Sequence, residues 1–504
     1  MPVRLRAKTV LHLSLQAGVF FAMAISSNAA GSADPLLVRV EGGLVKGSIE
    51  NGVDRFMGLP YASAPIGSLR WRNPQAIVPW EGVRRATRPG PCCIQPTSAQ
   101  ANAGAQPMSE DCLYLNLWRP ATATSKKLPV MVWLHGGAFV SGAGSLPLYN
   151  GSALAKRGVV VITLNYRLGA LGTFTLPALR ASSKGETGNF GLRDQEAALQ
   201  WVQRNVAAFG GDPRQVTLFG ESAGGASVLY HMGRPSMAGL FQRAIVQSGG
   251  LALPELNAVQ ADAVGFDMAK RVLPDDTPPE EWLDALRSLP ASRILDMPRT
   301  QADTMPYIDG VTLSSPMVAA FDTGHQLPIP LLIGRNDYEA GFFPPAFSQQ
   351  VPDRLGDRWS SIRPLTFGYA SQNPELAAQQ VAGLIFAGVN TRQIALGASK
   401  SSPVYLYRYA HVDESKVGKV AGAIHTAELP YLFGTLPKSA TAQDKHLSER
   451  LMDAWVSFAN GDASIEGLGV DWPQYTRDKP ELVLIEQSRI TTGQDPDTQL
   501  LDHL

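Results

Sequence analysis

Three kinds of feature are scarce in this sequence, and each scarcity excludes a class of protein. Only 3 cysteines occur, and no second Cys or His cluster has the spacing of metal ligands, which argues against a metal site. Its 44 basic and 44 acidic residues cancel, which argues against nucleic acid or an anionic membrane surface as the main partner. Beyond the N-terminus, no stretch is expected to be long and apolar enough to cross a bilayer.

Residues 1–30 form a separate segment. Arg4, Arg6 and Lys8 give it a positive start, and residues 10–25 are mostly apolar and contain no acid. Small residues suited to cleavage follow. This pattern is typical of a secretory signal peptide, with an uncleaved N-terminal anchor as the alternative. We therefore expect an exported protein, secreted or periplasmic, without stable membrane insertion once the segment is removed.

The three cysteines are Cys92, Cys93 and Cys112. In an exported protein this number suggests one disulfide bond and one spare thiol. The segment that leads to Cys112 consists largely of Ser, Ala, Gln, Pro and Gly, so it has little to bury and would need a covalent closure. The sequence itself does not decide whether Cys92 or Cys93 pairs with Cys112.

Buried strands alternate with helical segments through most of residues 31–504. Continuous apolar runs at 128–134, 159–165 and 329–334 predict strands that are covered on both faces. Apolar residues recur at a helical period over 192–209. This alternation predicts an α/β fold with a mainly parallel sheet, and without repeats or a low-complexity linker we expect one large domain with insertions.

Several other segments have recognisable patterns. Residues 36–49 alternate enough to predict edge strands, and the stretch from Phe56 onwards is dense in turn residues. A late strand is expected at 403–409 and an amphipathic helix at 447–460. Residues 343–400 are mixed and mainly helical in pattern, which is consistent with an insertion over the active edge of the sheet.

The most informative stretch is Gly220-Glu-Ser-Ala-Gly224, which follows a β-branched apolar run and precedes small, helix-compatible residues. Glycine at 220 and 224 leaves room where side chains would collide, so Ser222 can project from a strained turn between a strand and a helix. Free N–H groups at the helix N-terminus would favour developing negative charge. The pattern indicates a nucleophile elbow. The alternative is a chance Gly-x-Ser-x-Gly in a chain with 48 glycines.

A serine nucleophile needs a base, usually a histidine that a carboxylate holds in place. In α/β-hydrolases the acid follows the serine and the histidine comes last. His425 lies in a loop after the last predicted strand, where a catalytic histidine must lie. The other histidines after Ser222 have packing or end-of-chain explanations or no catalytic pattern around them: His231, His325, His411, His446 and His503.

The acid should lie at the end of a strand between these two residues. The loop Gly334-Arg-Asn-Asp-Tyr-Glu-Ala-Gly341 follows a predicted strand directly and offers Asp337 and Glu339. Either could also be a solvated loop charge, and spacing does not choose between them.

Attack of a serine on a carbonyl carbon also needs backbone donors, because the tetrahedral intermediate carries charge on the former carbonyl oxygen. The segment His135-Gly-Gly-Ala-Phe139 follows a buried strand, and its small side chains leave N–H groups free to face a substrate. An ordinary glycine turn after a strand is the alternative.

Read together, these residues resemble the type-B carboxylesterase family, the α/β-hydrolases that include cholinesterases and bacterial para-nitrobenzyl esterases. The resemblance covers nearly the whole chain after residue 30. Further matching motifs occur in order: Glu110-Asp-Cys-Leu-Tyr-Leu-Asn116, Asn165-Tyr-Arg167, Gly188-Asn-Phe-Gly-Leu-Arg-Asp-Gln195, Phe209-Gly-Gly-Asp-Pro213, Ser248-Gly249, Trp455 with Phe458-Ala459, and Trp472-Pro473 with Tyr475.

The resemblance implies an α/β-hydrolase fold and a serine hydrolase that acts on small carboxylic esters without a metal or cofactor. It also implies roles for six residues: Ser222 as nucleophile, Glu339 as acid, His425 as base, and Gly137, Ala138 and Ala223 as oxyanion donors. Amidase, carbamate hydrolase and lipase activities on the same residues are the nearer alternatives, and a non-catalytic adhesion protein of the same fold is the more distant one.

The family pattern implies a disulfide between Cys93 and Cys112, which would leave Cys92 spare. Two departures stand out. Ala138 occupies an oxyanion position where many members have glycine, which keeps the N–H donor, and Ala340 follows the acid where glycine is usual. The segment from Cys93 to Cys112 contains no aromatic residue. Cholinesterases bind the quaternary ammonium with a tryptophan there, so choline esters are not the expected substrates.

Overall fold

The computed structural model describes residues 34–96, 106–122, 126–181, 188–253 and 255–504. The chain from Leu36 to Leu504 forms one compact unit. The predicted signal peptide lies outside the described residues and stays a prediction.

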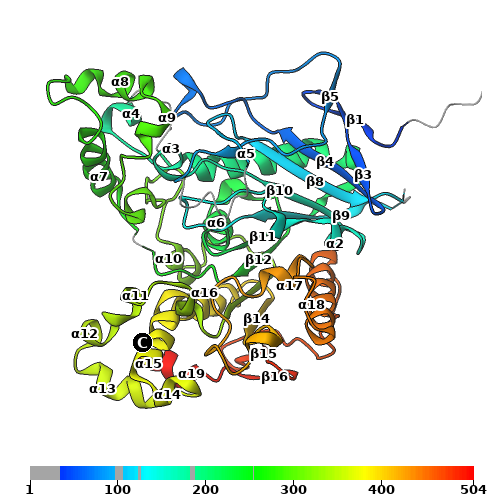
Figure 1. The fold of residues 1–504 in the computed structure, drawn as a ribbon, viewed down its shortest axis with the longest axis vertical. Coiled ribbons are helices and arrows are strands. Elements are labelled where there is room, and N and C mark those ends of the chain that lie inside the picture. The colour runs from blue at the N-terminus through cyan, green and yellow to red at the C-terminus, as the bar shows by residue number, and fades with distance from the viewer. Residues whose placement is uncertain (1–33, 97–105, 123–125, 182–187, 254) are drawn as a thin grey trace, which may run out of the picture. The chain divides into compact units, whose positions relative to one another are not determined.

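An 11-stranded sheet forms the centre of this unit (Figure 1). Its middle strands run parallel, and antiparallel strands complete both ends. The parallel strands, in spatial order, are β10 (Val160–Leu164), β9 (Leu128–Leu134), β11 (Gly211–Glu221), β12 (Arg243–Gln247), β13 (Leu331–Asn336), β14 (Val404–Tyr409) and β15 (Glu481–Ile485). The antiparallel strands are β8 (Tyr114–Pro120), β4 (Val53–Pro60) and β3 (Ser48–Glu50) at one end, and β16 (Ile490–Gln494) at the other. The prediction of a mainly parallel sheet is confirmed.

Helices cover both faces of the sheet, as the apolar runs predicted. In β9, Val132 and Leu134 belong to a core shared with α5 (Phe190–Asn205) and α6 (Ala223–Met232). The intervening Trp133 belongs to a second core with α18 (Ala442–Asn460). Because successive side chains of a strand point to opposite faces, a strand between two helical layers must be apolar at every position.

Two helix boundaries differ from the sequence prediction for local reasons. The last long helix, α18, begins at Ala442 because the Thr441 side chain accepts from the Asp444 N–H and Asp444 accepts from the Thr441 N–H. This capping box holds a polar first turn that apolar periodicity does not reveal. The regular part of α5 ends at Asn205, and a 3₁₀ turn, Val206–Phe209, completes the predicted helix.

Strand β4 occupies a stretch where turn residues suggested a connection. Its pairing with β8 shifts register between Phe56 and Leu59. Gly58, between them, has φ +70°, which is the conformation of a glycine at a bulge. Gly58, which suggests a turn in the sequence, therefore forms a bulge inside a buried strand. Strands β15 and β16 have no counterpart in the sequence prediction.

The segment 343–400 is mainly helical, as expected. It includes α11 (Ala346–Gln349), α15 (Pro374–Gly383), the π-helical turn η9 (Leu384–Gly388) and α16 (Val389–Ala398). The 25-residue stretch Pro374–Ala398 is apolar and long enough to span a membrane by length and composition, contrary to the expectation that no such stretch would occur. In the folded protein 61% of its most apolar window is buried, as in the core helix of a soluble protein.

The C-terminal helix α19 (Thr498–His503) lies beside α15 (Figure 1). Leu500 and Leu501 share a small apolar core with Val381 and Leu384. The end of the chain therefore packs against the helical insertion.

A disulfide bond joins Cys93 to Cys112, as the family resemblance implied. Cys92 is buried and keeps a free thiol. The closed segment includes residues 97–105, which lie outside the described residues.

Candidate active site

Ser222 lies at the apex between β11 and α6, with φ 55° and ψ −126°. This left-handed conformation is uncommon for a residue with a side chain. The turn is tight because a Cβ at Gly220 would collide with the backbone of Gly224, and a Cβ at Gly224 would collide with the Leu134 carbonyl. Strain of this kind persists only where the surrounding structure imposes it, and it occurs most often at functional sites.

The glycine loop after β9 lies directly against this turn. A Cβ on Gly136 would lie 3.0 Å from the Cβ of Ser222. Gly137 and Ala138 have φ values of +110° and +53°. Within the described residues, no backbone acceptor bonds the N–H groups of Gly137, Ala138 or Ala223. The structure thus brings together the three predicted oxyanion donors and Ser222.

The loop keeps its position through hydrogen bonds on both sides. The Tyr166 hydroxyl donates to the His135 carbonyl at 2.7 Å, and its ring stacks on the imidazole at 4.4 Å. The Gly169 N–H donates to the Phe139 carbonyl at 2.8 Å. Ala138 adopts its left-handed φ at a cost of roughly 1–2 kcal/mol that glycine would avoid.

Glu339 and His425 meet although β14 separates their loops. The Glu339 Oε2 atom lies 2.6 Å from His425 Nδ1, and both side chains are buried. The other carboxylate oxygen accepts from the Ser248 hydroxyl at 2.6 Å and from the Asn336 N–H at 2.8 Å. The carboxylate therefore has one oxygen fixed by the protein and one directed at the imidazole, as an orienting acid requires.

Asp337, the other candidate acid, has different partners. Its Oδ1 accepts from the Ala423 N–H at 2.7 Å, and its Oδ2 lies 3.7 Å from Arg408 Nη2. Burial raises the pKa of Asp337 to about 6, although the Arg408 guanidinium opposes this. Asp337 thus supports the backbone of the loop that carries His425 and does not contact the imidazole.

A residue that the sequence reasoning gave no role occupies the other side of the imidazole. His425 Nε2 lies 3.1 Å from Glu221 Oε1, the residue just before Ser222. The two atoms are misaligned, so Nε2 is buried without a hydrogen-bond partner among the described residues. No hydrogen bond joins Nε2 to the Ser222 hydroxyl among the described residues, and catalytic hydrogen bonds of this kind often tighten only when a substrate binds.

A third buried carboxylate lies near His425. Glu428, three residues after His425, accepts from Gln247 Nε2 at 2.9 Å and from Asn336 Nδ2 at 2.8 Å. Glu221 belongs to the elbow motif, and Glu428 follows His425 by three residues. Only the fold shows that they face the same imidazole.

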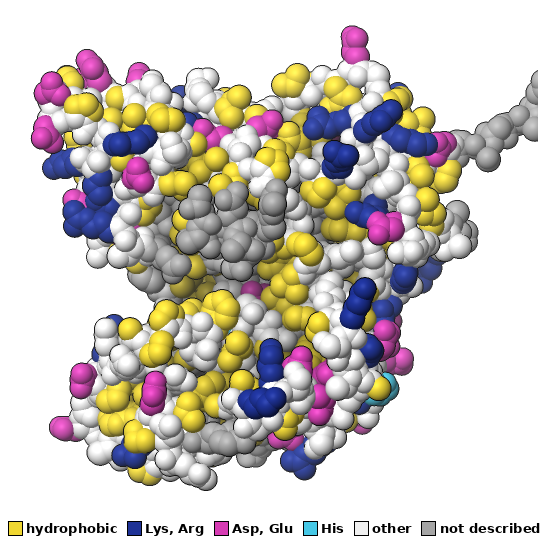
Figure 2. All heavy atoms as spheres, in the orientation of Figure 1, with side chains coloured by type: hydrophobic (Ala, Val, Ile, Leu, Met, Phe, Trp, Pro, Cys, Tyr) yellow, Lys and Arg dark blue, Asp and Glu magenta, His cyan; other side chains and the backbone are white. Residues whose placement is uncertain are grey.

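Aromatic rings form an apolar wall beside His425. Phe342, Phe343 and Phe386 have ring centroids 5.7, 5.8 and 5.5 Å from the imidazole. Phe386 comes from the π-helical turn η9, an irregularity that is frequent at functional sites. Figure 2 shows a hollow on this face, with hydrophobic side chains along its rim near α11 and α16. Phe342, just before the insertion, and Phe347 within it are 52% and 41% exposed, so the site has apolar surface that solvent reaches.

The two flanking glutamates determine the charge of the imidazole. Burial alone would lower the pKa of His425, but Glu221 and then Glu339 raise it to about 9. Burial also raises the pKa of Glu221 itself. Since a general base must be neutral, hydrolysis should fall as the pH drops through about 9.

Glu221→Gln should therefore move the acid limb of kcat/KM to lower pH, by about one to three units, because it removes the carboxylate that most favours the protonated imidazole. The measurement is the pH profile of kcat/KM for a simple aryl ester, with Glu428→Gln as the matched control. Glu428 raises the pKa of His425 less than Glu221 and Glu339 do, so Glu428→Gln should shift the acid limb of the profile less. Identical acid limbs in the wild type and Glu221→Gln would contradict this account.

Two other histidines, His231 and His411, have structural partners. His231 is buried on α6, with Nε2 2.8 Å from Gln195 Oε1. His411 Nε2 lies 3.0 Å from Asp444 Oδ1. The contact of His411 agrees with the packing role expected for it, and neither histidine contacts the elbow serine in the described residues. Within the described residues, no group of three or more His, Cys, Asp or Glu side chains is arranged to hold a metal ion.

Comparison with known proteins identifies the family. The carboxylesterase family model matches residues 34–373 and 366–501. The chain is 36% identical to the fumonisin B1 esterase of Sphingopyxis macrogoltabida, over 89% of this chain and 86% of that protein. It is also 36% identical to the para-nitrobenzyl esterase of Bacillus subtilis, over 92% of this chain and 97% of that protein.

A solved structure of a para-nitrobenzyl (PNB) esterase superimposes with a TM-score of 0.80 at 35% identity, and the match covers 93% of this chain and 100% of that one. Fold, sequence and family model therefore agree along almost the full described length. The chain belongs to the carboxylesterase family and is a carboxylic ester hydrolase of the α/β-hydrolase fold.

Proposed function

We propose that the protein hydrolyses small carboxylic esters through an acyl-enzyme on Ser222. His425 takes the proton of the Ser222 hydroxyl as the oxygen attacks the ester carbonyl. The charge on the former carbonyl oxygen is then stabilised by three backbone donors, the N–H groups of Gly137, Ala138 and Ala223.

The intermediate collapses when the C–O bond to the alcohol breaks and His425 returns the proton to the leaving oxygen. A water molecule, deprotonated by the same imidazole, then attacks the acyl-enzyme and releases the acid. Glu339 keeps the imidazole in the tautomer that presents Nε2 to the serine, and its charge stabilises the imidazolium.

One observation carries this proposal: a strained Ser222 lies beside backbone donors that have no protein acceptor. The N–H groups of Gly137, Ala138 and Ala223 have no acceptor within the described residues, while the loop around the first two is held by hydrogen bonds from the Tyr166 hydroxyl and the Gly169 N–H. Ala223 is the first residue of α6, where an N–H has no partner within the helix, and Gly137 and Ala138 are partly exposed. Three free N–H groups close to one strained serine support a role in binding an oxyanion.

The test is covalent labelling with phenylmethanesulfonyl fluoride, followed by peptide mass spectrometry. We expect a single sulfonyl adduct on the peptide that contains Ser222, formed in parallel with the loss of aryl ester hydrolysis. The expected reason is that the activated hydroxyl displaces fluoride from sulfur, whereas unactivated serines do not react.

Ser248 is the internal control, since its buried hydroxyl donates to Glu339 but lies outside the elbow. Labelling there, or inactivation without an adduct on the Ser222 peptide, would refute the assignment. Rates on aryl esters, triglycerides, anilides and carbamates would then rank the substrate classes, because the shape of the pocket decides among them.

A further inference from the structure

Two buried arginines lie side by side on the strands that lead to the acid and to the base. Arg335 of β13 and Arg408 of β14 are partners in the register of the sheet, and they are 3% and 5% exposed. Glu339 follows the end of β13 closely, and β14 leads into the segment that carries His425. Like charges directly opposite each other on neighbouring strands repel, and burial strengthens the repulsion. The arginine pair therefore needs a counter-charge.

The C-terminal segment supplies this counter-charge. A single oxygen of Asp497, Oδ2, accepts from Arg335 Nη2 at 2.8 Å and from Arg408 Nε at 2.9 Å. Asp497 is fully buried. Burial alone would raise the pKa of its carboxyl, but the two guanidinium groups hold that pKa below its usual range. One ionised carboxylate thus joins the ends of two adjacent strands.

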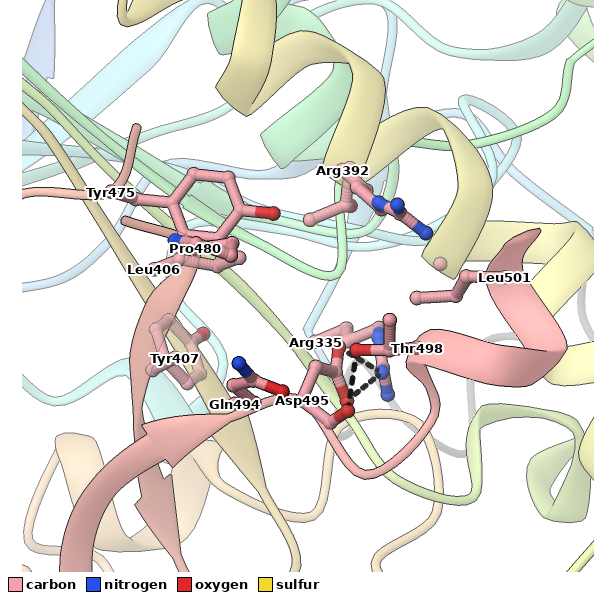
Figure 3. Close-up of a pocket in the computed structure, with 12 residues that line it drawn as sticks. Arg335, Arg392, Leu406, Tyr407, Tyr475, Pro480, Gln494, Asp495, Thr498 and Leu501 are labelled. Atoms are coloured by element: carbon pink, nitrogen blue, oxygen red, sulfur yellow. Dashed lines mark hydrogen bonds and ion pairs between the residues drawn. The ribbon is translucent and has the colours of Figure 1, made fainter. Parts of the chain in front are cut away.

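Asp495, the neighbouring carboxylate, contacts only one of the two arginines closely. Its oxygens accept from Arg335 Nη2 at 3.0 and 2.7 Å, and its Oδ1 also accepts from the Asp497 N–H at 3.0 Å. The same Oδ1 lies 3.9 Å from Arg408 Nε, which is too far for a hydrogen bond. Figure 3 shows Asp495 beside Arg335, where the chain passes from β16 into α19. Among the described residues, Asp497 is therefore the one carboxylate that is hydrogen-bonded to both arginines.

The arginine pair is also connected to the loop that carries His425. Asp337 Oδ2 lies 3.7 Å from Arg408 Nη2, and Asp337 Oδ1 accepts from the Ala423 N–H at 2.7 Å. A Cβ on Gly422 would lie 2.8 Å from Asp337 Oδ1, so the glycine lets this carboxylate approach the loop. The buried charges therefore reach from the C-terminal segment to the loop of the imidazole.

We propose that Asp497 is a positioning residue for the reaction. By holding Arg335 and Arg408 together it fixes the ends of β13 and β14, and with them the distance between the orienting acid and the imidazole. The inference rests on the proposed function, in which Glu339 orients His425 across 2.6 Å. Misplacement of a reacting group by about 1 Å can lower a rate about 10²-fold, so a contact this short is sensitive to the spacing of the two strands.

Asp497→Ala should lower kcat for a simple aryl ester by about tenfold to hundredfold, with little change in KM. It should also move the acid limb of kcat/KM to lower pH, by about half a unit to one unit, because a longer contact with Glu339 raises the pKa of His425 less. The measurement is steady-state kinetics across pH, with active sites counted from sulfonyl adducts on the Ser222 peptide. Partial unfolding lowers that count, but it moves neither KM nor the position of the limb.

Arg408→Gln cuts the same connection from the other side and changes the charge in the opposite sense. Loss of a negative charge lowers the pKa of a nearby imidazole, whereas loss of a positive charge raises it. Electrostatics alone would therefore move the acid limbs of Asp497→Ala and Arg408→Gln in opposite directions. Loss of positioning moves both limbs to lower pH. Arg408→Gln also supplies the test if Asp497→Ala does not fold.

Asp502→Ala is the matched control. Asp502 lies on the same C-terminal segment, but it pairs with Arg392 Nη2 of α16 at 2.6 Å and with neither strand arginine in the described residues. Its variant should keep the wild-type kcat and acid limb. The proposal is overturned if Asp497→Ala keeps both, if the limbs of Asp497→Ala and Arg408→Gln move in opposite directions, or if Asp502→Ala shifts the limb as much. Wild-type hydrolysis that did not depend on Ser222 would instead overturn the proposed function.

Discussion

Ser222→Ala should lower kcat/KM for aryl esters by about 10⁴- to 10⁶-fold while the protein stays folded. The loss is large because the hydroxyl is the atom that bonds to the acyl group, and the other groups of the site act on that bond. Within the described residues the Ser222 side chain makes no hydrogen bond, and it is 8% exposed, so its removal should hardly change the midpoint of thermal unfolding. The measurements are steady-state kinetics and a thermal melt of the same preparation.

Ser448→Ala is the matched control for this loss. Ser448 is also buried, but it lies on α18, which covers the face of the sheet opposite to α6, and its hydroxyl donates to the Tyr431 carbonyl at 2.6 Å. Its loss should cost some stability and leave kcat/KM within a few-fold of the wild type. Near-normal hydrolysis by Ser222→Ala would remove the serine mechanism altogether.

The sequence is most predictive where one physical requirement determines a residue. Strand β9 is buried on both faces, so every position must be apolar, and the run 128–134 matches the observed strand. The elbow is equally readable, since both glycines are demanded by backbone atoms that a Cβ would meet. In both cases the residue types themselves reveal the requirement, although the atom closest to a Cβ at Gly224 is the carbonyl of Leu134 in the neighbouring strand.

Predictions fail where the requirement comes from residues distant in sequence. Gly58 suggested a turn, but it is a bulge whose partner strand lies almost sixty residues further on. In the sequence, Glu221 is only the variable residue of the elbow motif. In the structure its Oε1 lies 3.1 Å from His425 Nε2. Phe386 lies in a helical insertion with no catalytic pattern, yet its ring is one of three beside the imidazole. Contacts of this kind cannot be read from spacing, because the intervening chain can have any length.

The choice between Asp337 and Glu339 is the clearest example. Sequence spacing allows either residue to be the acid, and the family resemblance implies Glu339. In the structure the two carboxylates have different hydrogen-bond partners. Glu339 Oε2 lies 2.6 Å from His425 Nδ1, whereas Asp337 accepts from the Ala423 N–H. One side chain can orient the imidazole and the other can only support its loop, so their substitutions must have different kinetic consequences.

Glu339→Gln should reduce kcat by about 10³- to 10⁴-fold with little change in KM, because a neutral amide neither fixes the tautomer nor stabilises the imidazolium. Asp337→Asn should stay within about tenfold of the wild type, since an amide oxygen can still accept from the Ala423 N–H. The measurement is kcat and KM for both variants on one aryl ester, with a thermal melt of each.

The pH profile of kcat/KM then distinguishes loss of the residue that orients His425 from general damage to the fold. Glu339 is among the groups that raise the pKa of His425, so the residual activity of Glu339→Gln should have its acid limb at lower pH than the wild type. Asp337 does not contact the imidazole, so Asp337→Asn should keep the wild-type limb. If Asp337→Asn instead lost the activity and shifted the limb, Asp337 would be the acid, and the loop would have to rearrange to bring it to His425.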